Sequence, residues 1–172
     1  MKNHTKTITF TALLLAMGIA LPHLFHAIGG QAAGMMWLPM HLVALLAGLA
    51  FGPVSGLTVG ALTPLLRFAI FGTPPLPLVW FMVIEVAAYG AFAGLLRKPC
   101  KLPAWTSLLF AQIAGRGVRM LSLFIAASWL GMDHLPAFTY VLTGELLLGL
   151  PGLVLQWAVV PPTTKLIDQH VR

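Results

Sequence analysis

Long apolar runs, separated by short breaks rich in glycine and proline, recur along the whole chain. A spanning helix needs roughly 20 apolar residues to cross a bilayer core about 30 Å thick, so these runs predict an all-α bundle of six transmembrane helices. The predicted helices are 8–25, 38–51, 54–71, 76–96, 105–130 and 136–160, the second being short for a full span. A glycine-rich loop is expected at 26–37, and Pro161-Pro162 is expected to end the last helix. The short connections predict a single integral membrane domain over residues 1–172.

The composition favours the bilayer over water as the surroundings of this chain. With 59% hydrophobic and 8% charged residues and a mean hydropathy of +0.92, it has too few charged side chains to cover a soluble domain. The basic start followed by an apolar run resembles a signal peptide, but the run is long and no cleavage site ends it, so a retained first helix is expected. The single cysteine, Cys100, excludes an internal disulfide and a cysteine-based metal cluster.

The net charge of +6 does not indicate a nucleic-acid partner, because the basic residues flank the apolar runs and do not gather on one face. They concentrate in the N-terminal tail, the 97–103 connection and the C-terminal tail, as Lys2, Lys6, Arg97, Lys98, Lys101, Lys165 and Arg172. The connections near 26–37, 72–75 and 131–134 contain no lysine or arginine. Since cytoplasmic loops carry the excess of basic residues, both termini are predicted to lie in the cytoplasm. The predicted location of the protein is the plasma membrane.

Ionisable groups inside the predicted spans are the main functional signal, because such groups are expensive in lipid. Gln112, Arg116 and Arg119 share one helix face at i, i+4 and i+7, and Glu85 and Glu145 lie at similar depth. One interpretation is that arginine–glutamate pairs only hold the helices together. The other is a polar pocket for a small molecule. With Arg67, three arginines face two glutamates, which favours a ligand bearing a carboxylate or other anion.

Aromatic and histidine side chains near the outer ends of the spans allow more than one interpretation. Tyr89 and Tyr140 could stack on a ligand, although aromatic residues at this level often form an interfacial belt. His23, His26 and His41 could bind a metal such as nickel or cobalt, yet no acidic partner stands near them and no Met-His start is present. Interfacial histidines are the simpler interpretation, and no metal or cofactor is predicted.

Small residues recur at four-residue spacing in two places. Ala12, Ala16 and Ala20 form one face of the first predicted helix, and Gly48, Gly52, Gly56 and Gly60 run from the second helix into the third. Such faces let helix backbones approach closely in lipid. Packing within the bundle is the expected role of the glycines.

The pattern resembles the substrate-binding S components of energy-coupling factor (ECF) vitamin transporters. The resemblance is carried by Leu38-Pro39-Met40-His41, Gly52-Pro53, Thr63-Pro64-Leu65-Leu66, Glu85 with Tyr89-Gly90, and Gly115-Arg116, within six short-looped helices. It implies a subunit that binds a water-soluble vitamin or related micronutrient. It also implies an ECF transmembrane coupling subunit docking on Ala12, Ala16 and Ala20, and two separate ATPase subunits. No nucleotide-binding or catalytic motif is visible in the chain.

The resemblance implies a ligand in the outer half of the bundle. The corresponding positions are Gly29, Gly30, Gln31, Glu85, Tyr89, Gln112, Arg116, Arg119, Tyr140 and Glu145. Pantothenate, folate, pyridoxine- or pyrimidine-type compounds, cobalamin and queuosine precursors remain open as substrates. Two other functions remain open: a self-contained small transporter or channel, and an intramembrane enzyme with Glu85 or Glu145 as general base.

Overall fold

The structure is a computed structural model that describes residues 2–130 and 144–170. Within these residues it is helical and contains no strand, with α1 (Lys2–Trp37), α2 (Pro39–Phe51), α3 (Pro53–Phe71), α4 (Leu78–Arg97), α5 (Ala104–Leu130), α6 (Glu145–Leu148) and α7 (Leu150–His170). Among the described residues, five stretches are long and apolar enough to cross a membrane: His4–Gly30, Ala32–Phe51, Pro53–Phe71, Leu78–Arg97 and Ala104–Trp129. The all-helical class is therefore confirmed. The beginning of the sixth predicted helix lies outside the described residues.

The predicted loop at 26–37 is wrong, because helical structure continues on both sides of a two-residue kink. Gly29 and Gly30 leave the helical conformation, and Gly30 has φ +65°, a backbone conformation that glycine adopts without strain. The alanine and methionine residues after the kink favour a helix, so the second span begins at Ala32. This earlier start gives the second span the length that residues 38–51 alone lack.

The C-terminal helix also differs from the prediction. It breaks at Gly149 between α6 and α7, and α7 passes through Pro161 and Pro162 to His170. Proline removes a backbone donor, but helices in apolar surroundings tolerate it when neighbouring groups satisfy the freed carbonyls. The predicted helices 54–71, 76–96 and 105–130 agree with α3, α4 and α5 to within two residues at each end, whereas the predicted helix 8–25 is shorter than α1 at both ends.

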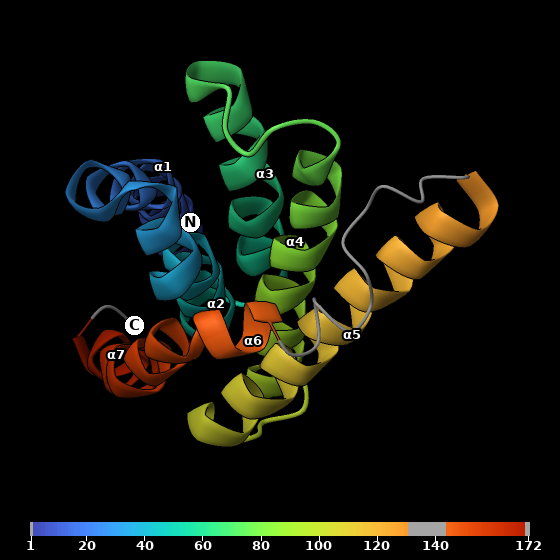
Figure 1. Cartoon of the computed structure of the whole chain (residues 1–172). Coiled ribbons are helices and arrows are strands. Elements are labelled where there is room, and N and C mark those ends of the chain that lie inside the picture. The colour runs from blue at the N-terminus through green and yellow to red at the C-terminus, as the bar shows by residue number, and fades with distance from the viewer. Residues whose placement is uncertain (1, 131–143, 171–172) are drawn as a thin grey trace.

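α2 lies at the centre of the molecule, with α1, α3, α4 and α7 packed around it (Figure 1). All of its residues from His41 to Ala50 are buried, as expected for a helix that is apolar on every side. Leu45 and Leu49 of α2, Tyr89 of α4 and Leu108 of α5 belong to one continuous core.

The predicted packing role of the glycines is confirmed where α2 and α3 meet α4. A Cβ on Gly48 or Gly56 would overlap with the backbone of Gly90, and one on Gly60 would overlap with the backbone of Val86. The glycines thus allow backbone-to-backbone contact at the centre of the bundle. By contrast, Ala12, Ala16 and Ala20 are exposed.

The two ends of the bundle differ: one carries a cluster of ion pairs and the other surrounds a cavity. At one end Asp168 of α7 bonds Arg97 at 3.0 Å and Lys98 at 3.3 Å, beside the turn at Gly52. The other end contains the kink of α1, the start of α2, the end of α3 and the start of α4. This second end surrounds a cavity.

Candidate functional site

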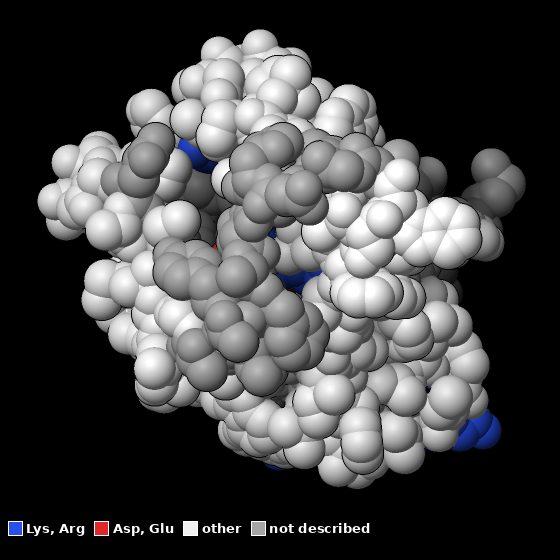
Figure 2. All heavy atoms as spheres, turned by 45° about the vertical axis from the view of Figure 1, so that its right-hand side comes forward, with Lys and Arg blue, Asp and Glu red and all other residues white. Residues whose placement is uncertain are grey.

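The cavity has a volume of about 370 Å³ and is lined by residues from α1 to α6. On the face shown in Figure 2, uncharged side chains dominate, and small basic and acidic areas appear inside a hollow. Met35, Met40 and Met82 form much of the apolar wall, together with prolines such as Pro74 and Pro75. Methionine is flexible and polarisable, so such walls adapt to the shape of a ligand.

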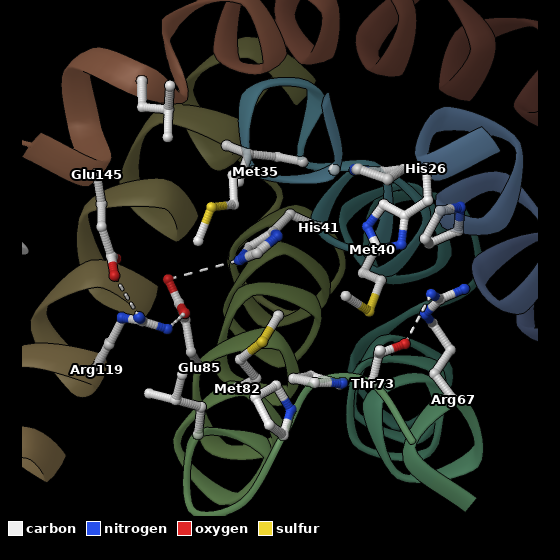
Figure 3. A pocket seen from close by; sticks show the side chains of 18 of the residues that line it. His26, Met35, Met40, His41, Arg67, Thr73, Met82, Glu85, Arg119 and Glu145 are labelled. Carbon is white, nitrogen blue, oxygen red and sulfur yellow. Dashed lines mark hydrogen bonds and ion pairs between the residues drawn. The ribbon is translucent and has the colours of Figure 1, made fainter. Parts of the chain in front are cut away.

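Four charged side chains from three helices meet on one side of the cavity, and Figure 3 labels Glu85, Arg119 and Glu145 among them. Arg119 of α5 donates from Nη1 to Glu85 Oε2 and from Nη2 to Glu145 Oε1, both at 2.7 Å. Arg116 Nη1 lies 3.4 Å from Glu145 Oε2 and 3.6 Å from Glu85 Oε1. We call these residues the charge cluster. Its two positive and two negative charges balance, as a buried ionic group requires.

His41 of α2 completes this side of the cavity. Its Nε2 lies 3.5 Å from Glu85 Oε1, and its ring meets the ring of Tyr89 edge-on at 4.9 Å. Neither ring nitrogen of His41 has a hydrogen-bond partner among the described residues, and the same holds for Glu85 Oε1 and for Nε and Nη2 of Arg116. Buried polar atoms are almost always bonded, so these atoms are candidates for contact with a bound molecule.

Arg67 of α3 lines the opposite side of the cavity (Figure 3). It is 1% exposed. Its Nη1 donates to the carbonyl of Ile19 at 2.8 Å and its Nη2 to Thr73 Oγ1 at 3.2 Å, and the guanidinium lies 5.4 Å from the ring centre of Phe71. Within the described residues, no carboxylate lies within ion-pair distance of Arg67.

The structure places the predicted site residues in three groups. Glu85, Arg116, Arg119 and Glu145 line the cavity, as the convergence of polar groups predicted. Gly29, Gly30 and Tyr89 do not line it, although Gly30 makes the kink and Tyr89 supports His41. Tyr140 and the side chain of Gln31 lie outside the described residues.

Gln112 does not reach the cavity, although it shares a helix face with Arg116. Its Nε2 donates to Gln156 Oε1 at 2.8 Å, and its Oε1 accepts from Trp157 Nε1 at 2.9 Å. It therefore joins α5 to α7, because α7 crosses α5 one turn away from the charge cluster.

Several cavity residues are absent from the site that the sequence predicted. They include His26, His41, Arg67 and Thr73. Arg67 and both histidines carried a signal, as ionisable groups near the ends of spans, whereas nothing in the sequence marked Thr73. The three histidines weighed as metal ligands do not meet: His23 stacks on Phe71, and among the described residues no three metal-binding side chains come together.

Comparison with known proteins agrees with this geometry. A family model for the substrate-specific component of ECF transporters matches residues 6–163, nearly the whole chain. No curated protein and no solved structure shows a significant match. The resemblance inferred from the sequence is confirmed by the family match, and the helices place the protein in a membrane. The chain belongs to the family of substrate-specific components of ECF transporters.

Proposed function

We propose that this protein binds a water-soluble vitamin or related micronutrient outside the cell and delivers it to partner subunits for ATP-driven uptake. The observation that carries the proposal is the cavity, in which buried polar atoms of His41, Glu85 and Arg116 make no hydrogen bond among the described residues. A mostly apolar cavity with a few convergent polar groups is typical of small-molecule sites.

The distribution of charge supports an outward-facing cavity. The cavity lies at the end of the bundle opposite to Arg97 and Lys98, and the connections around it lack basic residues. Under the positive-inside rule, the Arg97 end faces the cytoplasm. We propose six spans in one integral membrane domain of the plasma membrane, the last of them formed by the C-terminal region. Because the number of spans is even, both termini then lie on the same side, in the cytoplasm.

The size of the cavity favours the smaller candidate substrates. About 370 Å³ is near the lower end of the usual range for ligand pockets, roughly 300–1,000 Å³. Pantothenate and pyridoxine- or pyrimidine-type compounds fit this size best. Cobalamin is much too large to be enclosed in it.

The exposed alanine face supports docking of a coupling subunit. Ala12, Ala16 and Ala20 point away from the bundle, so they are not needed for its internal packing. A face of small side chains allows close approach of a partner helix in lipid. We propose that an ECF transmembrane coupling subunit packs here and that two ATPases bound to it supply the energy.

Native mass spectrometry of the purified full chain tests the proposal. A vitamin-sized molecule is expected to co-purify, and the purified protein should rebind it with a Kd below micromolar. Reconstituted alone, the protein should not accumulate that molecule in vesicles. Uptake without partners would favour a self-contained transporter, and chemical conversion of the molecule would favour an enzyme. If no vitamin co-purifies or binds, the proposal is wrong.

A further inference from the structure

Among the described residues, the charges that line the cavity do not sum to zero. Glu85 and Glu145 are both bonded to Arg119 and lie close to Arg116, so the charge cluster is balanced. Arg67 is buried on the other side and has no carboxylate near it in the described part of the chain. The described lining therefore carries one uncompensated positive charge inside the membrane, where an unpaired ion is costly.

Resting on the proposed function, we propose that Arg67 and Thr73 form an anion subsite that binds the carboxylate of a monoanionic substrate. The charge cluster and His41 would then hold uncharged polar groups at the other end of the same molecule. Arg67, and not Arg116 or Arg119, is the residue that selects for negative charge.

The hydrogen-bonding capacity of Arg67 fits this role. A guanidinium has five N–H donors in a planar fork, and only two of the described contacts use them, to Ile19 and Thr73. Its Nε is buried and has no partner among the described residues. Thr73 Oγ1 accepts from Arg67, which leaves its own hydroxyl proton to donate. A carboxylate can thus take two bonds from the fork and a third from Thr73.

The rest of the cavity lining indicates which chemical groups the remainder of the ligand should contain. Met40 and Met82 lie between Arg67 and Glu85 in Figure 3, so the middle of the molecule should be apolar. At the far end, Glu85 Oε1 is an acceptor and Arg116 Nη2 a donor that make no hydrogen bond within the described residues. These atoms suit a hydroxyl, an amide or a ring nitrogen, which contain donors and acceptors without net charge.

Charge balance distinguishes a carboxylate from a phosphate ester. One carboxylate neutralises the single positive charge of Arg67. A phosphate monoester carries about −1.5 to −2 at neutral pH and would leave net negative charge in a buried site. We therefore expect the free acid of a vitamin to bind more tightly than either its amide or its phosphorylated form.

Matched acid and neutral compounds test the subsite in the full-length protein. The probes are nicotinate with nicotinamide and pantothenate with panthenol, and Kd is measured for wild type, Arg67→Gln, Arg67→Lys and Thr73→Val. We expect wild type to bind an acid roughly 100-fold more tightly than its neutral counterpart, in the range of a buried charged pair. Arg67→Gln should abolish this preference. Arg67→Lys should keep only part of it, because lysine lacks the fork. Thr73→Val should weaken the binding of the acid and leave the binding of the neutral compound unchanged. Equal binding of both compounds by wild type, or an unchanged preference in Arg67→Gln, would overturn the subsite.

A second measurement does not depend on the vitamin. Benzoate, a minimal carboxylate, should raise the thermal unfolding midpoint of wild type but not that of Arg67→Gln, since a ligand of the folded state stabilises it. Benzamide should raise neither. If benzoate acts on both proteins alike or on neither, the anion subsite is wrong. If benzoate stabilises wild type but not Arg67→Gln while every vitamin fails to bind, the subsite holds and the proposed function is wrong.

Discussion

Arg119 of α5 and Glu85 of α4 bond across the centre of the bundle, with Nη1 2.7 Å from Oε2 and both side chains buried. The same guanidinium reaches Glu145 of α6 through its other terminal nitrogen. Arg119 therefore ties three helices together at the wall of the cavity. The arrangement makes Glu85 important for folding as well as for the shape of the site.

Replacing Glu85 by glutamine should destabilise the protein strongly. The substitution keeps the size of the side chain but leaves Arg116 and Arg119 with one carboxylate, Glu145. Removing one partner of a buried ion pair costs about 3–5 kcal/mol, measurable by unfolding in detergent. Asp168→Asn is the matched control, because its pairs with Arg97 and Lys98 are partly exposed and should contribute less than about 1 kcal/mol. Equal losses in the two variants would contradict the buried cluster.

A methyl group at Gly90 should disrupt the contact between α3 and α4. The Cβ of Gly90→Ala would overlap with the backbone of Gly56, and backbone cannot move aside as a flexible side chain can. We expect a loss of about 1–3 kcal/mol or more in the free energy of unfolding. At Gly117 on α5 an added Cβ meets nothing within 4 Å, so Gly117→Ala should be neutral or stabilise by up to about 1 kcal/mol. Similar effects at the two positions would argue against close helix packing.

The sequence was sufficient to predict the all-helical fold and the convergence of the ion pairs, because both follow from strong local signals. Long apolar runs fix the spans, and the cost of charge in lipid forces Glu85, Glu145 and the α5 arginines toward one another. The spacing of small residues was not sufficient by itself to predict which helix faces pack inside the bundle. The glycines from Gly48 and the alanines from Ala12 share a four-residue period, yet only the glycines face a neighbouring helix.

Other features depend on tertiary contacts that local patterns do not encode. Gln112 has the correct helical phase for the cavity, but the position of α7 gives it Gln156 and Trp157 as partners. Thr73 enters the cavity because the connection after α3 folds back toward Arg67. Pro161 and Pro162 predicted a helix end, but α7 continues through both of them to His170. The sequence therefore predicted the charge cluster well and the Arg67 side of the cavity poorly.

The alanine face can be tested separately from the cavity. Ala16→Trp should abolish co-purification with the ECF coupling subunit, because a bulky side chain prevents close helix approach. Vitamin binding should be unchanged, since Ala16 is exposed and does not line the cavity. Met17→Trp is the control, one residue and 100° around the helix, where a large side chain is already exposed. Normal assembly of Ala16→Trp would exclude this face as the docking site.

Gln112→Leu should separate stability from binding. The substitution leaves Trp157 Nε1 and Gln156 Oε1 without the bonds that they make to Gln112, and an unsatisfied buried polar group costs about 1–3 kcal/mol. Unfolding in detergent should show this loss, while the Kd of the co-purified vitamin should stay within about twofold, a change of less than 0.5 kcal/mol. Arg116→Ala, one turn along the same helix, should weaken vitamin binding, because its Nε and Nη2 have no hydrogen-bond partner in the described part of the chain. It should also lower stability, because its Nη1 lies close to Glu85 and Glu145. A Gln112→Leu protein that folds normally but loses the vitamin would place Gln112 in the binding site after all, and would require α7 to move when the ligand binds.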